Sequence, residues 1–128
     1  MKLLIDTHIF LWLMTDPNKL SKTARDACMD VENNLYLSVA SLWEIQIKTE
    51  RGKLHIDIPL QQIVTEQSDK FEVLPITANH ILALNRLPTH HNDPFDRMLI
   101  AQALTEEAYL ISADQVVQQY ANSINLVW

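Results

Sequence analysis

A strand, an acidic residue and a helix follow one another in residues 2–14, KLLIDTHIFLWLM. Lys2 to Ile5 is a short apolar run rich in strand formers, and Asp6 ends it. His8 to Met14 continues as a short helix, which stops before Pro17 because proline cannot continue the helical hydrogen-bond pattern. The segment therefore predicts a strand–helix unit with a carboxylate at the carboxyl end of the strand.

Strands and helices continue to alternate along the rest of the chain. Ser21 and Ser38 can cap two of the helices, and Gly52 suits the position just after the second of them. The predicted helices cover 22–32, 39–51, 59–69, 77–86, 94–107 and 115–120, and the predicted strands cover 35–37, 71–76, 109–112 and 124–127. The strands are apolar on both faces, which is typical of a parallel sheet covered by helices on two sides. We therefore expect an α/β fold with a mostly parallel sheet of about five strands.

Length and composition restrict the class of protein. The 128 residues fit a single domain, residues 1–128, and contain no apolar run of the roughly 18 residues that a transmembrane helix needs. The single cysteine, Cys28, excludes an internal disulfide and fits a reducing, cytoplasmic setting. The single glycine, Gly52, excludes the glycine-rich loops that hold phosphate in nucleotide-binding proteins. A net charge of −6 argues against a protein that coats nucleic acid, but not against an enzyme that meets it through bound cations.

Acidic residues follow two of the predicted strands. Asp6 comes directly after the first strand, and Asp114 comes two residues after the strand that ends at Ser112. Each could simply cap the helix that follows it. Capping explains the residue type, but it does not explain why both acids fall at the carboxyl ends of strands. That edge of the sheet is where α/β folds place their ligand sites.

Three further acids belong to predicted helices or their caps. Asp96 shares a helical face with Leu99, and an unpaired carboxylate on an apolar face is costly, so a bound cation is the favoured explanation. Asp93 is better explained as the N-cap of the same helix. Glu44 borders the apolar face of its helix, where a solvated pair with Lys48 would be a sufficient explanation. A role for Glu44 at the site requires this border to face the sheet edge.

Four separated carboxylates, Asp6, Glu44, Asp96 and Asp114, could therefore converge on one place. Negative charges within a few ångströms of one another repel unless cations bind. A set of oxygen ligands favours hard divalent ions such as Mg²⁺ or Mn²⁺. Such a cluster can position one or two metal ions for the attack of water on a phosphodiester.

Four motifs of the sequence strongly resemble those of PIN domains, and in particular of the VapC toxins of bacterial toxin–antitoxin pairs. They are LLIDTHIFLW (3–12), SVASLWEI (38–45) with KTERGKL (48–54) after it, HHNDPFDRMLIAQ (90–102) and YLISAD (109–114). Each motif alone is modest evidence. All four in this order, over nearly the whole chain, are highly specific.

The resemblance implies a PIN-like three-layer sandwich and a magnesium-dependent endoribonuclease of the cytoplasm, with Mn²⁺ as a substitute ion. The family's acidic quartet would be filled by Asp6, Glu44, Asp96 and Asp114, which would hold the metal and carry catalysis. Asp93 would be a further ligand or would support one. The implied partners are an RNA substrate, a VapB-like antitoxin and a second copy of the chain in a homodimer, without a membrane.

Other residues near these motifs are candidates for contact with RNA. Ser112 stands where many relatives have Thr or Ser beside the last acid, and the candidate backbone contacts are Arg97, Lys48 and Arg51. A solvated helix end is the alternative for the basic residues. His90 and His91 resemble metal ligands, but we favour a flexible loop before a helix cap, with contact to phosphate as the alternative.

A phospho-receiver module has a similar length and a similar α/β pattern. That class needs an acid pair after the first strand and a lysine after the last. Here Thr7 and His8 follow Asp6, and no lysine follows the strand predicted at 124–127. A PIN-like binding protein without catalysis is disfavoured because the quartet of acids is complete.

Overall fold

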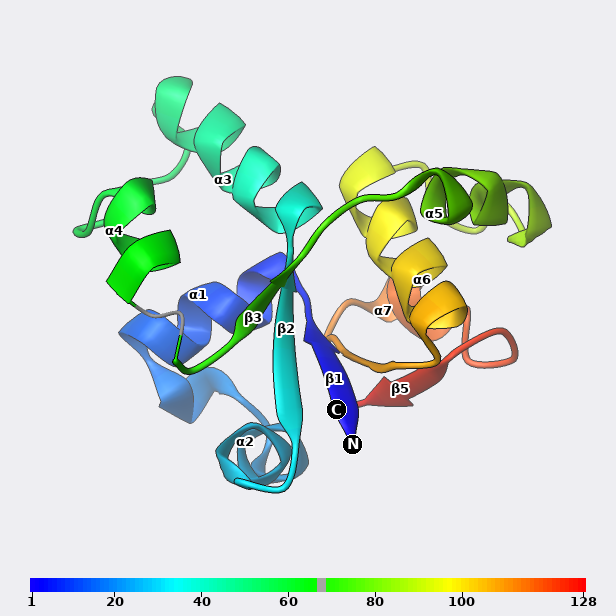
Figure 1. Cartoon of the computed structure of the whole chain (residues 1–128), viewed down its shortest axis with the longest axis horizontal. Helices are drawn as coiled ribbons and strands as arrows, with labels where there is room; N and C mark the ends of the chain where they lie inside the picture. Colours follow the sequence, from blue (N-terminus) through cyan, green and yellow to red (C-terminus); the bar gives the residue numbers. More distant parts are fainter. Residues whose placement is uncertain (67–68) are drawn as a thin grey trace.

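In residues 1–66 and 69–128, which the computed structural model describes, five parallel strands form one sheet in the order β3-β2-β1-β4-β5 (Figure 1). The strands are β1 (Lys2–Ile5), β2 (Asn34–Ser38), β3 (Glu72–Leu74), β4 (Tyr109–Ile111) and β5 (Asn125–Val127). All four neighbouring pairs are parallel. The predicted parallel sheet is confirmed.

Helices cover both faces of this sheet and make a sandwich of three layers (Figure 1). On one side lie α1 (Thr7–Thr15), α2 (Lys22–Met29), α3 (Val39–Glu50) and α4 (Leu60–Glu66), and on the other lie α5 (Ala78–Ala83), α6 (Pro94–Glu106) and α7 (Gln115–Gln118). Short 3₁₀ helices follow α1 at Pro17–Lys19 and α5 at Leu84–Arg86. No helix in the described part of the chain is long and apolar enough to cross a membrane.

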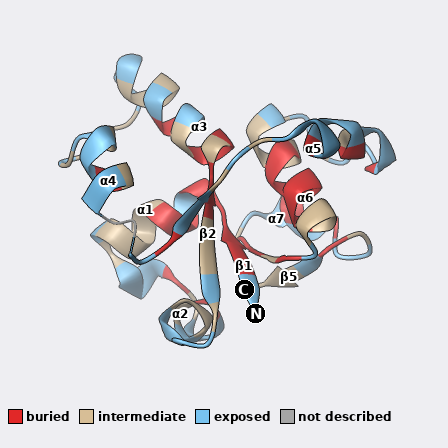
Figure 2. Cartoon of the chain, in the orientation of Figure 1, coloured by how far each residue is buried: buried red, intermediate tan, exposed pale blue. Residues whose placement is uncertain are grey.

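Strand β1 lies at the centre of both apolar cores. Leu3 and Ile5 point into the core under α1 to α4, and Leu4 points into the core under α5 to α7, because successive side chains of a strand face opposite sides. All three are fully buried. Burial of each such side chain stabilises the fold by about 1.5–3 kcal/mol. Figure 2 shows the buried residues concentrated in β1 and along α6.

The predicted helix caps are present. The Ser21 hydroxyl accepts a hydrogen bond from the Ala24 amide, and the Ser38 hydroxyl accepts one from the Ala40 amide. Gly52 follows α3 with a φ of +68°, a left-handed conformation that glycine adopts without strain. These contacts explain why α2 and α3 begin at the predicted residues.

Several predicted elements end early. Helix α2 stops at Met29 instead of residue 32, because the Asp30 carboxylate accepts the Glu32 amide in a turn that competes with the helix. Strand β3 covers only three residues of the predicted 71–76, and α5 changes to a 3₁₀ turn after Ala83. Helix α4 covers 60–66, and residues 67 and 68 of the helix predicted at 59–69 lie outside the described residues.

Helix α6 ends in a way that the sequence does not indicate. Glu107 adopts a left-handed conformation with φ 53° and ψ 42°, and the Ala108 amide donates to the Ala103 carbonyl, as in a helix C-cap that usually contains glycine. A left-handed conformation costs a residue other than glycine about 1–2 kcal/mol. Glu107 is therefore a strained position.

We expect Glu107→Gly to raise the free energy of unfolding by about 0.5–1 kcal/mol. The variant relieves the left-handed strain, and this gain exceeds the cost of ordering a glycine, which is more flexible in the unfolded chain. The matched control, Glu50→Gly at the right-handed end of α3, is expected to lower it by a similar amount. Urea unfolding followed by circular dichroism measures both. A loss of stability in Glu107→Gly would contradict the assignment of strain.

Candidate active site

The carboxyl ends of β1 and β4 lie side by side where the strand order reverses. From β1 the chain continues to β2 on one side, while β4 pairs with β1 on the other. The Asp6 amide donates to the Ile111 carbonyl at 3.1 Å and joins the two strand ends. Such a reversal leaves a crevice at the strand ends, which is the usual ligand site of open parallel sheets.

Asp6 is buried at this edge, with 4% of its surface exposed. Its carboxylate oxygen Oδ1 accepts the Ile9 amide at 2.8 Å, so Asp6 caps α1 as the sequence allows. Burial raises the pKa of Asp6, and the hydrogen bonds from Ser112 and Ile9 oppose the shift only in part. The nearby Asp114 carboxylate adds to the rise. Asp6 therefore caps α1 and also lies near a second acidic residue, Asp114.

Glu44 faces the same edge from α3 and is only 4% exposed. The Thr7 hydroxyl donates to its Oε1 at 2.7 Å, and the Lys48 ammonium donates to its Oε2 at 2.7 Å. The alternative pair with Lys48 thus exists, but Glu44 is not solvated. Because Thr7 follows Asp6, the first bond ties Glu44 to the start of α1.

Asp96 lies in the first turn of α6, which Asp93 caps by accepting the amides of Phe95 and Asp96 at 2.9 and 3.1 Å. Burial raises the pKa of Asp96 to about 6, and the negative charge of Asp93 adds to this, followed by Glu44 and Asp6. The carboxylates are therefore close enough to repel one another. The predicted N-cap role of Asp93 is confirmed.

Asp114 completes the group from the start of α7. Its Oδ1 accepts the amides of Val116 and Val117, while its Oδ2 lies 4.0 Å from His91 Nε2. Ser112 is fully buried beside it, accepts the Asp114 amide at 3.2 Å and hydrogen-bonds the Asp6 carboxylate. Ser112 therefore supports both acids from below the surface, and its contact with substrate stays a prediction.

His91 lies within the acid cluster, beside Asp96 and Asp114, although the sequence favours a loop residue over a metal ligand at this position. Its Nε2 is 2.9 Å from Asp96 Oδ2 and 4.0 Å from Asp114 Oδ2. The Tyr120 hydroxyl accepts the amides of His90 and His91 and donates to the Pro88 carbonyl, so hydrogen bonds to a buried side chain hold this loop. No motif spacing relates His91 to Tyr120, because their contact depends on tertiary structure.

The basic residues named from the sequence lie in different surroundings. Lys48 is paired with Glu44 and keeps about two-fifths of its side chain exposed. Arg51 is exposed just after α3. Arg97 donates to the carbonyls of Leu84, Pro88 and His91 and thus holds the loop that carries His91. Its guanidinium therefore has a structural role in this loop.

The chemistry of the donor atoms fits a hard divalent cation. Carboxylate oxygens approach from the starts of α1, α6 and α7 and from α3, and the helix N-termini supply only partial positive charge. Within the described residues, His91, Asp96 and Asp114 bring possible ligand atoms within 4.8 Å of one another. Oxygen-rich sites of this kind suit Mg²⁺ or Mn²⁺.

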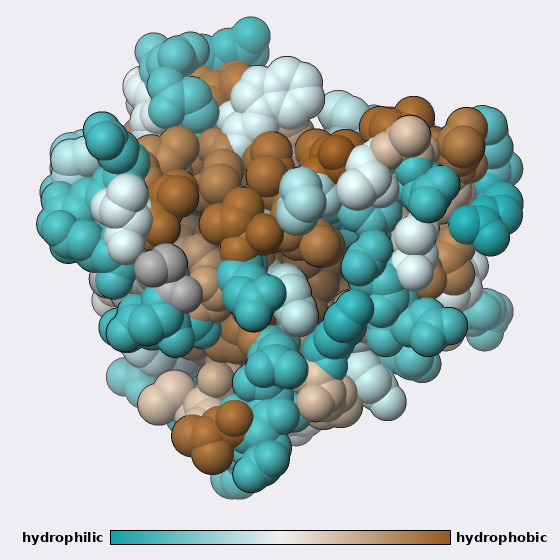
Figure 3. Space-filling model, viewed as in Figure 1, coloured by the Kyte–Doolittle hydropathy of each residue, from teal (hydrophilic) through white to brown (hydrophobic). Residues whose placement is uncertain are grey.

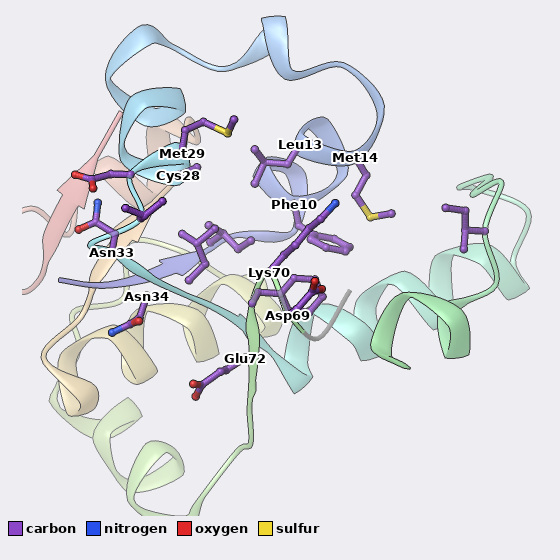
Figure 4. Close-up of a pocket in the computed structure, with 16 residues that line it drawn as sticks. Phe10, Leu13, Met14, Cys28, Met29, Asn33, Asn34, Asp69, Lys70 and Glu72 are labelled. Atoms are coloured by element: carbon purple, nitrogen blue, oxygen red, sulfur yellow. The ribbon is translucent and has the colours of Figure 1, made fainter. Parts of the chain in front are cut away.

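A separate apolar groove of about 810 Å³ lies between α1, α2 and β2. Figure 4 shows Phe10, Leu13 and Met14 of α1 and Cys28 and Met29 of α2 around it. Among the described residues, its lining contains none of the acids of the cluster, and its charged members are Asp30, Asp69, Lys70 and Glu72. Apolar surface also gathers in the middle of the face seen in Figure 3.

Comparison with known proteins gives one consistent family. Residues 3–123 match the family model for the PIN domain. Ribonuclease VapC22 of Mycobacterium tuberculosis is 23% identical to the chain over 118 residues, which make up 91% of this chain and 90% of that protein.

Solved structures share the fold. A chain in the crystal structure of DNA-bound VapBC from Salmonella typhimurium superposes with a TM-score of 0.72 at 14% identity, with 98% of this chain and 96% of that chain covered. A chain of VapBC2 from Rickettsia felis bound to promoter DNA gives 0.70 at 15% identity, with 98% and 97% covered. The expected PIN-like sandwich is confirmed.

We expect Asp96→Asn to stabilise the metal-free protein at neutral pH. Because the folded-state pKa is about 6 and the ordinary value is 3.8, ionisation of Asp96 destabilises the native state as pH rises from about 4 through 6. The variant should exceed the parent by about 1–3 kcal/mol at pH 7.5, and this difference should disappear below pH 4. Urea unfolding in EDTA across this range measures it.

The matched control is Asp26→Asn, at an exposed acid whose pKa is lowered by its bond to Lys22. Asp26→Asn should be slightly less stable than the parent at neutral pH, because it loses the bond to Lys22. This change is opposite in sign to that expected for Asp96→Asn. If Asp96→Asn were no more stable than the parent at pH 7.5, the inference that burial and neighbouring acids destabilise the ionised Asp96 carboxylate would be contradicted.

Proposed function

The chain belongs to the PIN domain family, and from this premise we propose that it is a metal-dependent endoribonuclease, the toxin of a VapBC-type toxin–antitoxin pair. The observation that supports the proposal is the placement of Asp6 and Asp114 after neighbouring strands, with Asp96 close enough to Glu44 and Asp6 for their charges to raise its pKa. The name of the relative Ribonuclease VapC22 supports the choice of RNA. We propose as well that residues 1–128 form one PIN domain and that the protein acts in the cytoplasm.

In this proposal Asp6, Asp96 and Asp114 hold the Mg²⁺, or Mn²⁺ in its place, and Glu44 completes the site. When bound, the ion would supply the acidity that activates water and the positive charge that a cleaved phosphodiester requires. Asp93 supports the site through the cap that orients Asp96.

The chain's own contacts orient these carboxylates. Asp6 and Asp114 each use Oδ1 to cap a helix, so neither cap occupies Oδ2. Thr7 and Lys48 hold the two oxygens of Glu44. Charged groups that are already held in place need no reorganisation when the substrate binds. This preorganisation is the main source of electrostatic catalysis. The exposed part of Lys48 and the exposed Arg51 lie on α3 or its end and would bind the RNA backbone.

We assign the apolar groove to a VapB-like antitoxin. Three acids, Asp30, Asp69 and Glu72, and one base, Lys70, lie among its lining residues. This pattern suits a peptide segment with apolar anchors and basic flanking residues. Two relatives of the same fold were solved as VapBC complexes with DNA, which supports a partner of this kind.

We also propose that two copies of the chain associate. Trp43 on α3 and Ile81 and Leu82 on α5 are large apolar side chains that remain exposed, with Trp43 60% exposed. Exposed apolar side chains of this size are typical of interaction surfaces.

Asp6→Asn should abolish most RNA cleavage while the fold survives. Asparagine can still cap α1 but cannot contribute negative charge, so metal affinity and cleavage should each fall by about two orders of magnitude. Cleavage of total RNA across a magnesium titration measures this. The control is Asp16→Asn, at an aspartate cap outside the site. Cleavage by the parent in EDTA, or normal cleavage by Asp6→Asn, would rule out the mechanism.

Leu13→Glu should weaken binding of the antitoxin by about 10–100-fold, because it places a charge in an apolar groove with an acidic rim. Calorimetry with a VapB-like antitoxin measures the affinity. Leu104→Glu, at a half-buried leucine of α6 outside the groove, is the control for general damage. Equal loss of affinity in both variants, or no loss in Leu13→Glu, would place the antitoxin elsewhere.

A further inference from the structure

We propose that His91 is a positioning residue for the acid cluster: its Nε2–H donates to Asp96 and holds Asp96 in the orientation that a cation requires. Nε2 lies 2.9 Å from Asp96 Oδ2 and 4.0 Å from Asp114 Oδ2, between acids that belong to different helices. The inference rests on the proposed function because it concerns the same site.

The hydrogen bond at His91 Nδ1 shows whether Nε2 acts as a hydrogen-bond donor or as a metal ligand. The Asp93 amide donates to His91 Nδ1 at 3.2 Å, so Nδ1 is the acceptor and the ring hydrogen is assigned to Nε2. A nitrogen that carries a hydrogen has no lone pair for a cation. Coordination through Nε2 would move the hydrogen to Nδ1, where it would face the Asp93 N–H.

The loop fixes the ring at this place before any cation arrives. Tyr120 is fully buried, and its hydroxyl accepts the His90 and His91 amides, each at 3.0 Å, and donates to the Pro88 carbonyl at 2.8 Å. Arg97 donates to the carbonyls of Pro88 and His91. A ring carried on a backbone that is anchored in this way is preorganised.

The contact with Asp96 is short but not yet aligned. Nε2 is buried and makes no hydrogen bond of good geometry with any described residue, although Asp96 Oδ2 is within reach. A small rotation of the carboxylate completes the bond, as is common when a site tightens around its ligand. Once Oδ2 is held by His91, the other oxygen of Asp96 is left for the cation. Residues that support a ligand in this way typically change metal affinity by about 10–100-fold.

The test measures binding of Mn²⁺ to the full chain without RNA, by the loss of the free Mn²⁺ electron-resonance signal. His91→Leu removes the donor and should weaken binding by about 10–100-fold. His91→Gln places an amide hydrogen near the Nε2 position and should restore affinity to within a few-fold of the parent. His90→Leu, in the same loop with the ring packed on Tyr120, should bind like the parent. Thermal unfolding in EDTA reports whether each variant is folded.

Two results would overturn the inference: parent-like binding by His91→Leu, or a His91→Gln protein no better than His91→Leu. Ring NMR of the parent gives a second test that needs no variant, since the hydrogen should stay on His91 Nε2 when Mg²⁺ binds. Its loss from Nε2 would make His91 a ligand instead. A parent that binds Mn²⁺ but cleaves no RNA would overturn the proposed function alone, whereas a parent that binds no Mn²⁺ would overturn both.

Discussion

The burial of β1 between two helical layers is the constraint on which the rest of the structure depends. Leu3, Leu4 and Ile5 are fully buried, so the residue that follows them must begin inside the protein as well. That residue is Asp6, and its carboxylate is buried with them. A charge in this position is costly unless hydrogen bonds or a cation compensate it, so the end of β1 is a candidate ligand site.

Capping and metal binding are not competing explanations for Asp6 and Asp114. An aspartate has two oxygens, and in both residues Oδ1 accepts helix amides while Oδ2 remains for other contacts. The cap fixes the side chain and leaves its second oxygen free of the helix amides. Helix N-termini that converge on one place also moderate the repulsion among the acids. The same residues therefore begin helices and build the cluster.

Local patterns predicted most of the fold and part of the site. Caps at Ser21 and Ser38 and the acids after β1 and β4 depend on neighbours in sequence, so they could be found there. The role of His91 depends on Tyr120, and the left-handed turn at Glu107 uses a residue type that gives no such signal. These features arise from tertiary packing, which overrides local preference.

The central claim is that Asp6, Asp96 and Asp114 bind one divalent cation at the junction of β1 and β4. Anomalous diffraction from crystals soaked in Mn²⁺ tests it most directly, since it locates the ion without assuming a reaction. The account predicts a peak in contact with carboxylate oxygens of Asp6 and Asp96. A well-soaked crystal with no peak at this junction, or with its strongest peak beside the apolar groove, would contradict it.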